Sequence, residues 1–487
     1  MHNKNLKPMV AALMAAALLL AGAVQAAEDE DVQKRIEKLE SELTELKGQV
    51  SQNSQQAAVT QQDLEEVRVV KKGTKLTYGG YIKLDAMFSN YSEGKPDNQT
   101  GIEQFMQPKL IPIENKNPAI DSDSYQSLNV HAQESRFNFG TVTGTDAGVL
   151  SSFIEMDFLT SVNGNELVSS SWAVRLRHAF VKWQYGKNSS FLAGQTWSNF
   201  MNTAALPDLL DFVGPVGTIF SRQPQIRWTT HGFTVTLENP YTALDDASCN
   251  RFQEGEYIPP GQSVGDCKRQ YEDDNGKTQA DTVSRVNVQT DSEVIPDVIL
   301  RYDGSVGTLS WAAIAMGRQL AYDKRSNGGN TQASDDTAFG YGLNLSGVWQ
   351  LGRNDLRFSA LYGDALGRFF AIYGFNDGYI DADGNIETFD QYGGFIAYRH
   401  FWSDRWRSTF SLSGAWADNP SDAFGDAALN TTVDGWAKEY RSFHMNLNYM
   451  PTPAFQLGGE LILASREVED GRSGNLGRLQ FSARYAF

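Results

Sequence analysis

Arginine side chains recur in this chain at positions that alternate with apolar residues. The candidates, with one lysine, are Lys83, Arg136, Arg175, Arg177, Arg227, Arg301, Arg399 and Arg407. A guanidinium group binds a carboxylate through two parallel hydrogen bonds and keeps its own charge. Cationic side chains along a water-filled wall favour the passage of anions. The pattern therefore predicts a pore lined by arginines.

An alternative interpretation stays open for these arginines. Four carboxylates share the same inward phase, namely Glu155, Asp157, Glu238 and Glu460. Ion pairs within the wall would then neutralise the arginines and leave them no role in selecting a solute. In the segment from 172 to 185 it is also ambiguous which alternate residues face inward, because Ala179, Val181 and Trp183 have the same parity as Arg175 and Arg177.

The segments that carry these arginines alternate between apolar and polar residues, which is the period of a β-strand. About sixteen such segments run from residue 75 to the end of the chain, and one of them is predicted over 127–143. The chain ends Leu479-Gln480-Phe481-Ser482-Ala483-Arg484-Tyr485-Ala486-Phe487. One face of this segment is apolar and ends in an aromatic residue. The fold class predicted is an all-β transmembrane barrel of about 16 antiparallel strands, whose C-terminal signature is Tyr485 and Phe487.

The connections between these segments alternate between short and long, as in outer-membrane barrels. An even number of strands places both ends of the barrel on the side of the short turns, which is the periplasmic side. We therefore expect the outer membrane of a Gram-negative bacterium as the location, with lipid and, through Phe487, the barrel-assembly machinery as partners.

The first 72 residues are predicted to lie outside the barrel. Residues 1–26 combine Lys4 and Lys7 with an apolar run and a small-residue cleavage site, which is typical of a signal peptide. Residues 27–72 space apolar residues alternately three and four apart, which indicates an α-helical coiled coil in the periplasm. The barrel is assigned to residues 73–487.

Charge and cysteine content limit the other functions. The chain has 42 Lys and Arg against 59 Asp and Glu, for a net charge of -17, which argues against nucleic acid as a partner. Its two cysteines, Cys249 and Cys267, fall in one long polar loop over 240–294. In an exported chain this favours a disulfide within the loop.

One long connection differs from the others because it is apolar. Residues 198–221 contain Phe200, Leu206, Pro207, Asp208 and Asp211. Such a loop would be poorly solvated outside, so we expect it to fold into the barrel and narrow the pore. Asp208 and Asp211 would then face the arginines across the constriction and create a transverse field. The alternative is an outward lid or a contact between subunits.

No motif indicates an enzyme, a cofactor or a metal site. The histidines fall in no recognisable nucleophile or metal signature. Acidic residues between Asp377 and Glu387, including Asp381, resemble a calcium loop, but Gly384 stands at the wrong place for an EF-hand, so we interpret the segment as a turn.

Several motifs together resemble the DcaP-like porin family. They are Gly80-Tyr81-Ile82-Lys83-Leu84-Asp85, Glu134-Ser135-Arg136-Phe137, Arg175-Leu176-Arg177-His178 and Gly194-Gln195-Thr196-Trp197-Ser198-Asn199-Phe200-Met201 leading into Leu206-Pro207-Asp208. The resemblance implies a homotrimer of sixteen-stranded barrels joined by N-terminal coiled coils. It also implies diffusion of small anionic solutes such as dicarboxylates.

Two functions follow as hypotheses. The first is an outer-membrane porin that passes small hydrophilic solutes, favouring anions, with no cofactor and no covalent step. The second is an envelope tether that acts through its coiled coil and has a closed barrel. Small polar residues in the inward phase, such as Ser359 and Ser411, favour the porin.

Overall fold

The computed structural model describes most of the chain after residue 72. The described ranges are 73–96, 99–115, 123–160, 164–165, 171–246, 267–272, 278–283, 287–290, 293–322, 336–370, 372–380, 385–420 and 435–487. The predicted signal peptide, the predicted coiled coil and Cys249 of the predicted disulfide lie outside these residues, and so do Asp381 and Asp383 of the acidic turn.

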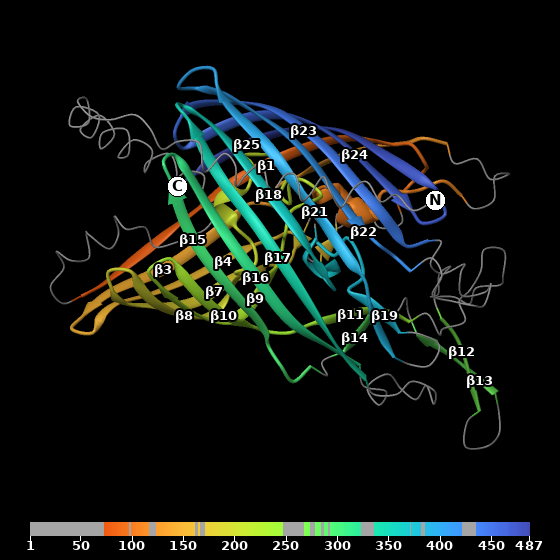
Figure 1. Ribbon diagram of the computed structural model, residues 1–487. Coiled ribbons are helices and arrows are strands. Elements are labelled where there is room, and N and C mark those ends of the chain that lie inside the picture. The colour runs from red at the N-terminus through yellow and green to blue at the C-terminus, as the bar shows by residue number, and fades with distance from the viewer. Residues whose placement is uncertain are drawn as a thin grey trace.

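The described residues form a closed antiparallel barrel (Figure 1). β1 (Thr74–Tyr91) closes it, because one edge of β1 pairs with β25 (Ser473–Ala486) and the other with β2 (Tyr125–His131) and β3 (Arg136–Thr145). The remaining wall strands are β4 (Gly148–Asp157), β7 (Arg175–Gly186), β8 (Ser189–Trp197), β9 (Arg222–Thr230), β10 (Phe233–Glu238), β15 (Asp297–Val306), β16 (Leu309–Tyr322), β17 (Asp336–Leu351), β18 (Asn354–Asp364), β21 (Asp390–Phe401), β22 (Trp406–Ala417), β23 (Ala437–Thr452) and β24 (Phe455–Val468). β2 and β3 pair with successive parts of β1, so together they count as one strand of the wall. Within the described residues the predicted number of sixteen strands is thus confirmed.

The predicted strand over 127–143 is broken in two, which corrects that prediction. The backbone turns between Ala132 and Ser135, where the Ser135 N–H donates to the Ala132 carbonyl at 3.1 Å. The Ser135 hydroxyl accepts the Lys83 N–H at 3.0 Å and replaces a strand partner there. The break turns Glu134 into the interior, where it is 3% exposed.

β7 contains the irregularity that made its phase ambiguous in the sequence. The pairing of β4 with β7 shifts register between Glu155 and Met156, opposite Arg177. Both Arg177 and His178 are consequently buried, although they are neighbours in the chain. Beyond the shift, Val181 and Trp183 are exposed on the outside. The arginines of this strand thus face the interior, while apolar residues of the same parity face outward.

Short elements lie in the long connections. The helices are α4 (Gln99–Gln104), η1 (Pro108–Leu110), η2 (Thr203–Ala205) and η4 (Gly367–Phe369). The strands are β5 (Gly164–Asn165), β6 (Ser171–Trp172), β11 (Thr242–Asp246), β12 (Cys267–Glu272), β13 (Thr278–Val283), β14 (Asn287–Thr290), β19 (Gly378–Ile380) and β20 (Ile386–Thr388). The order β14-β11-β19-β20 joins two long connections in one small sheet, at the end of the barrel opposite the C-terminus (Figure 1).

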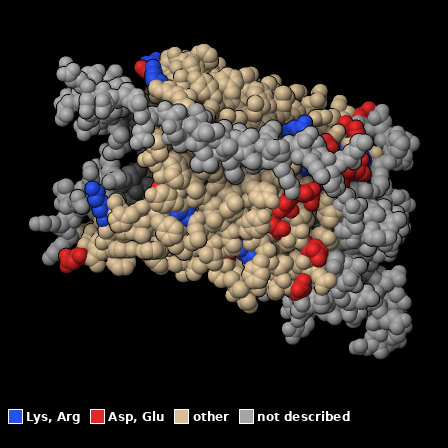
Figure 2. Space-filling view, in the orientation of Figure 1, with Lys and Arg blue, Asp and Glu red and all other residues tan. Residues whose placement is uncertain are grey.

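The outer wall is apolar and the inner wall is polar. Along β25, Leu479 and Phe481 are 46% and 60% exposed, whereas Arg478 and Gln480, which alternate with them, are buried. Figure 2 shows acidic side chains gathered at one end of the described surface and few charges between the two ends. Uncharged bands of this kind face lipid in transmembrane barrels. Among the described helices, none is long and apolar enough to cross a membrane.

The C-terminal residues complete the seam of the barrel. The Phe487 N–H donates to the Gly80 carbonyl at 3.1 Å, and the Gly80 N–H donates to the Phe487 carbonyl at 3.2 Å. Tyr485 and Phe487 are about half exposed, and the Phe487 ring lies 6.2 Å from the Phe137 ring. The terminal aromatics predicted as a signature therefore lie at the outer surface beside the seam.

Candidate functional site

Residues 198–221, here called the constriction loop, enter the barrel between β8 and β9. Phe200, Phe212 and Val216 are each less than a tenth exposed. They belong to an apolar cluster that also contains Ile102 and Phe105 beside α4 and Phe369 and Phe370 beside η4. Since three connections meet in this cluster, the loop has apolar surface to bury inside the barrel. The loop thus packs against the other two connections, and its role in narrowing the pore stays a prediction.

Wall side chains hold the backbone of this loop along its length. The Lys83 ammonium donates to the Leu210 carbonyl at 2.8 Å, and the Leu210 N–H donates to the Glu460 carboxylate. Asn344 donates to the Phe200 carbonyl at 2.7 Å, and Asn446 donates to the Asp208 carbonyl at 2.7 Å. Buried backbone groups need such partners, because an unpaired one costs about 1–3 kcal/mol.

The far end of the loop comes into direct contact with the wall. The Gly217 N–H donates to the Ser413 hydroxyl at 2.7 Å. A Cβ atom on Gly217 would lie 2.3 Å from the Gly394 carbonyl oxygen of β21. Only glycine fits at that separation, so this contact fixes the distance between the loop and the wall.

The first arginine cluster lies on β3, β7 and the start of β9 and consists of Arg136, Arg175, Arg177 and Arg222. Two carboxylates of β4 face it. Glu155 accepts from Arg177 at 2.7 Å and from Arg136 at 3.3 Å. Asp157 accepts from Arg175 through two bonds of 2.8 Å and from Arg177 at 2.8 Å.

Phe212 of the constriction loop covers this first cluster. The guanidinium carbons of Arg136, Arg175 and Arg177 lie 5.9, 5.9 and 5.1 Å from the centre of its ring. Arg136 and Arg177 are 2% and 0% exposed. The structure thus places two of the arginines predicted to line the pore behind the loop instead, because the loop packs against them.

The second arginine cluster lies on β18, β21 and β22 and consists of Arg357, Arg399 and Arg407. Asp355 accepts from Arg357 and from Arg399 at 2.8 Å each. Asp208 of the constriction loop accepts from Arg407 and lies 3.8 Å from Arg399. Asp208 therefore meets arginines as predicted, but in direct contact with them and not across an open gap.

Asp211 has a different place from the one predicted. Its carboxylate accepts the backbone N–H groups of Met106 at 2.7 Å, Val213 at 3.1 Å and Gly214 at 3.0 Å. It faces no arginine within ion-pair distance in the described part of the chain. Its carboxylate stabilises the turn of the loop, because a loop that bends inside a barrel must satisfy its N–H groups locally.

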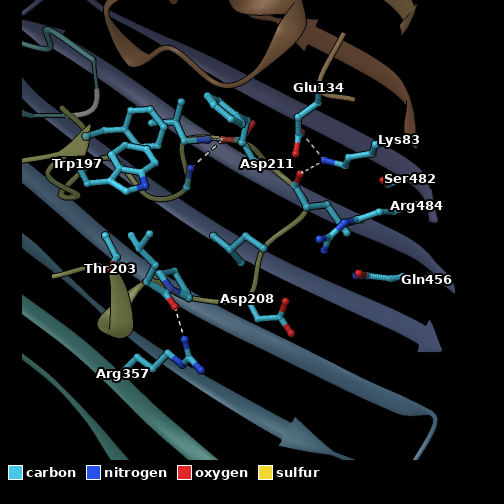
Figure 3. A pocket seen from close by; sticks show the side chains of 18 residues that line it. Lys83, Glu134, Trp197, Thr203, Asp208, Asp211, Arg357, Gln456, Ser482 and Arg484 are labelled. Carbon is cyan, nitrogen blue, oxygen red and sulfur yellow. Dashed lines mark hydrogen bonds and ion pairs between the residues drawn. The ribbon is translucent and has the colours of Figure 1, made fainter. Parts of the chain in front are cut away.

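A recess lies beside the constriction loop and is shown in Figure 3. Its charged and polar lining combines wall residues with the loop: Lys83, Glu134, Asp208, Asp211, Arg357, Gln456, Ser482 and Arg484. Leu206 and Pro207 line the recess as well, as the prediction of a constriction requires. The recess is where the barrel interior meets the loop.

The remaining predicted cations serve mainly to fix the loop or its flanks. Lys83 contacts Glu134 and lies 3.3 Å from Asp85. Arg227 donates to the Trp197 carbonyl at 2.9 Å, just before the loop begins. Arg301 donates to the Met201 carbonyl at 3.2 Å and pairs with Asp303.

Two arginines were not singled out in the sequence, Arg357 and Arg222. Arg357 lines the recess together with Arg484, which the alternation does place in the inward phase, and Arg222 joins the first cluster. Strand alternation alone could have found Arg357, which stands between Leu356 and Phe358. Arg222 stands at the boundary between loop and strand, where alternation gives no signal.

The described residues contain no group of side chains placed to hold a metal ion. Of the acidic turn, Asp377 is described; it is fully buried and pairs with Arg318 at 2.9 Å. Its role there is to balance a buried charge in the wall.

Comparisons with known proteins agree with this architecture. A family model described as DcaP outer membrane protein matches residues 28–237. The fold is similar to the outer membrane channel DcaP of Acinetobacter baumannii, with a TM-score of 0.61, 20% identity, and coverage of 86% of this chain and 98% of that chain. The comparison with curated proteins finds no match.

More distant solved structures are also porins or outer membrane proteins. An anion-selective porin from Comamonas acidovorans has a TM-score of 0.44 at 11% identity, covering 85% of this chain and 100% of that chain. OmpT of Vibrio cholerae, in a trimer form, has a TM-score of 0.45 at 10% identity, with the same coverage. The family match and the DcaP fold confirm the resemblance predicted from the motifs.

Proposed function

We propose that this chain, a DcaP-like outer membrane porin by its family match and its fold, passes small anionic solutes through the recess beside its constriction loop. Passage is passive: the solute exchanges part of its hydration for guanidinium groups and leaves again. The proposal includes no cofactor and no catalytic step.

The observation that carries this proposal is the state of the charges around the recess. Its acidic groups are already engaged: Glu134 by Lys83, Asp208 by Arg407, and Asp211 by three backbone N–H groups. Arg484, in contrast, has no carboxylate within ion-pair distance in the described residues. Its guanidinium lies over the Tyr81 ring, 4.1 Å from the ring centre. Among the described residues, the charged side chain of the recess that is left without a partner of opposite charge or a hydrogen bond is therefore a cation.

A second cation faces the recess from a different strand. Arg357 comes from β18 and Arg484 from β25, and both point toward the space beside Asp208 (Figure 3). Arg357 shares Asp355 with Arg399, so one carboxylate serves two guanidinium groups. Two cations on different strands around one recess suit a solute with a carboxylate at each end, which supports a preference for dicarboxylates.

The assembly belongs to the same proposal. We infer a homotrimer, joined below the membrane by coiled coils of residues 27–72 after removal of residues 1–26. We also infer a disulfide between Cys249 and Cys267 in the external loop over 240–294, and recognition of Phe487 by the assembly machinery. The family resemblance supports the trimer, and the sequence pattern supports the other features.

The test is the reversal potential of the full chain in a planar bilayer under a salt gradient. We expect anion preference, three conductance steps, and block by succinate. Arg484→Gln and Arg357→Gln are expected to reduce the anion preference, and their combination to reduce it most. Arg353→Gln is the matched control, because Arg353 pairs with Asp404 at an exposed turn, 60% exposed and remote from the recess.

Two results would overturn the proposal. Cation preference of the wild-type protein would contradict the charge argument. Absence of conductance from correctly folded protein would favour the closed barrel and the tether function, for which the apolar cluster inside the barrel is the structural support.

A further inference from the structure

The first arginine cluster contains more positive charge than its surroundings balance. Its four guanidinium groups face two carboxylates, Glu155 and Asp157. Glu134 and Asp85 lie nearby and share Lys83, so with Lys83 included the region has five cations and four carboxylates. His178, the other titratable side chain here, lies 3.8 Å from Glu155. Buried charges that lack partners cost several kcal/mol each, so this imbalance requires an explanation.

Among the described residues, Arg222 is the member of the cluster that has no ion-pair or hydrogen-bond partner. Its Nη1 atom is buried and has no hydrogen-bond acceptor among the described residues. Its guanidinium lies 4.6 Å from the centre of the Trp197 ring and close enough to Arg177 for their charges to repel each other. The ring does not provide the acceptor that the guanidinium N–H groups need.

Other donors in the same place are also unpaired. Buried N–H groups without an acceptor in the described chain include Nη2 of Arg177, Nε and Nη2 of Arg136, and Nε1 of Trp197. The Arg177 guanidinium lies 5.8 Å from the Trp197 ring, on which Arg222 also packs. Buried polar groups in folded proteins nearly always have partners, so the unpaired donors of Arg177, Arg222 and Trp197 around one ring indicate an acceptor that the described residues do not supply.

Three aromatic side chains separate this place from the recess. Trp197 and Phe220 have ring centres 4.8 Å apart, and Phe212 and Phe220 have ring centres 5.3 Å apart. All three rings are less than a tenth exposed. Arg136, Arg177 and Arg222 do not line the recess, whereas Trp197, Phe212 and Phe220 do. Whatever binds the arginines lies behind this aromatic layer.

We propose that the first arginine cluster binds one resident inorganic anion of halide size, held by Arg177, Arg222 and the Trp197 N–H. The anion supplies both the missing negative charge and the missing acceptor. It is enclosed when Phe212 packs over the cluster, and it stays in place while solutes pass the recess. A small ion suits this place better than an organic carboxylate, which would need room behind the aromatic rings.

The resident anion joins the constriction loop to the wall. Phe212 and Phe220 of the loop pack on the same arginines that hold the ion. An ion that binds the folded state and not the unfolded state stabilises the fold in proportion to the logarithm of its concentration, once it exceeds the dissociation constant. The thermal stability of the protein should therefore depend on chloride beyond the effect of ionic strength.

The experiment is anomalous X-ray diffraction from the full chain crystallised in bromide, combined with thermal unfolding. We expect an anomalous peak between Arg177 and Arg222 that persists when succinate is added. We also expect a melting temperature that is higher in sodium chloride than in sodium gluconate at equal ionic strength. Arg222→Gln should remove the peak and the chloride dependence. Trp197→Phe, which removes only one N–H donor, should lower the bromide occupancy.

Arg484→Gln is the matched control, since Arg484 also lacks a carboxylate but lines the recess. It should change the ion selectivity and keep the bromide peak, so failure of the resident site and failure of the channel proposal are distinguishable. The inference is overturned if folded wild-type protein shows no bromide peak there, if Arg222→Gln keeps the peak, or if succinate displaces it, which would make the site a solute site.

Discussion

The two arginine clusters on the inner wall are alike in composition and different in access. In the first, Asp157 bridges Arg175 and Arg177, and in the second, Asp355 bridges Arg357 and Arg399. The first is covered by Phe212 of the constriction loop, whereas Asp208 of the same loop joins the second through its carboxylate. The same loop therefore covers the first cluster with the apolar ring of Phe212 and adds the carboxylate of Asp208 to the second.

This difference shows that an inward position is not the same as a pore-lining position. Arg177 and Arg357 both face the interior of the barrel, but Arg177 is fully buried while the Arg357 side chain is 12% exposed toward the recess. The charge that a solute meets is decided by where the loop packs.

The largest expected effect comes from removing the bridging carboxylate of the covered cluster. Asp157→Ala removes the carboxylate that Arg175 and Arg177 share, and Arg177 is fully buried. Loss of one partner of a buried ion pair costs about 3–5 kcal/mol. Asp355→Ala should cost less, about 1–3 kcal/mol, because Arg357 reaches the recess and Arg399 keeps Asp208 nearby.

The measurement is equilibrium unfolding by urea in detergent micelles, followed by intrinsic fluorescence. Asp404→Ala, whose carboxylate is 91% exposed at a turn, is the control and should leave the midpoint unchanged. Equal losses for Asp157→Ala and Asp355→Ala would show that the two clusters do not differ in access.

A somewhat smaller effect is expected from uncovering the first cluster. Phe212→Ala removes the ring above Arg136, Arg175 and Arg177 and should cost about 3 kcal/mol, typical of a buried Phe→Ala change. Because the arginines would then face the recess, the anion preference should increase although no charge has been added. Reversal potentials of the two proteins give the comparison, and an unchanged value would mean that Phe212 is not the barrier.

The smallest effect on stability, with a clear effect on selectivity, is expected for Asp208→Asn. The loop keeps its other attachments, such as the bonds of Leu210 to Lys83 and Glu460. The second cluster loses a negative charge, so anion preference should increase. Selectivity measured against pH provides an independent check.

Lowering the pH should change the anion preference in the same direction as Asp208→Asn. Burial raises the pKa of Asp208, but Arg407 and Arg399 lower it more, so the pKa of this carboxyl lies below its ordinary value. A carboxyl with a lowered pKa stays charged at every pH above the ordinary value of about 3.9 and loses its contribution only as pH falls further. Asp208 should therefore leave the selectivity unaffected at and above its ordinary pKa, and it should increase anion preference only as the pH falls through its lowered pKa. Asp208→Asn should remove that acid dependence.

Alternation and loop length were sufficient to predict a barrel of about sixteen strands. They could not predict the break between β2 and β3, because it depends on Ser135 and Glu134 finding partners on β1. They could not predict the register shift in β7 either, since both phases of that strand carry apolar residues.

The candidate site was harder to predict from the sequence, because it too depends on contacts between residues that are distant in the chain. The polarity of Arg136 and Arg177 shows that they point inward, but only the packing of Phe212, more than thirty residues away along the chain, shows that they are covered. Asp208 and Asp211 look equivalent in the sequence. One meets arginines and the other meets backbone N–H groups, because the loop bends between them.

The bonds that hold Leu210 have a consequence for the order of folding. Its N–H bonds Glu460 across 250 residues of sequence, and its carbonyl accepts from Gln480 across 270. Contacts this remote form slowly, because a long stretch of chain must close before they are gained. The constriction loop therefore cannot reach its final conformation until β24 and β25 have folded. We therefore expect the barrel wall to form first and the constriction loop to fold into it late in biogenesis.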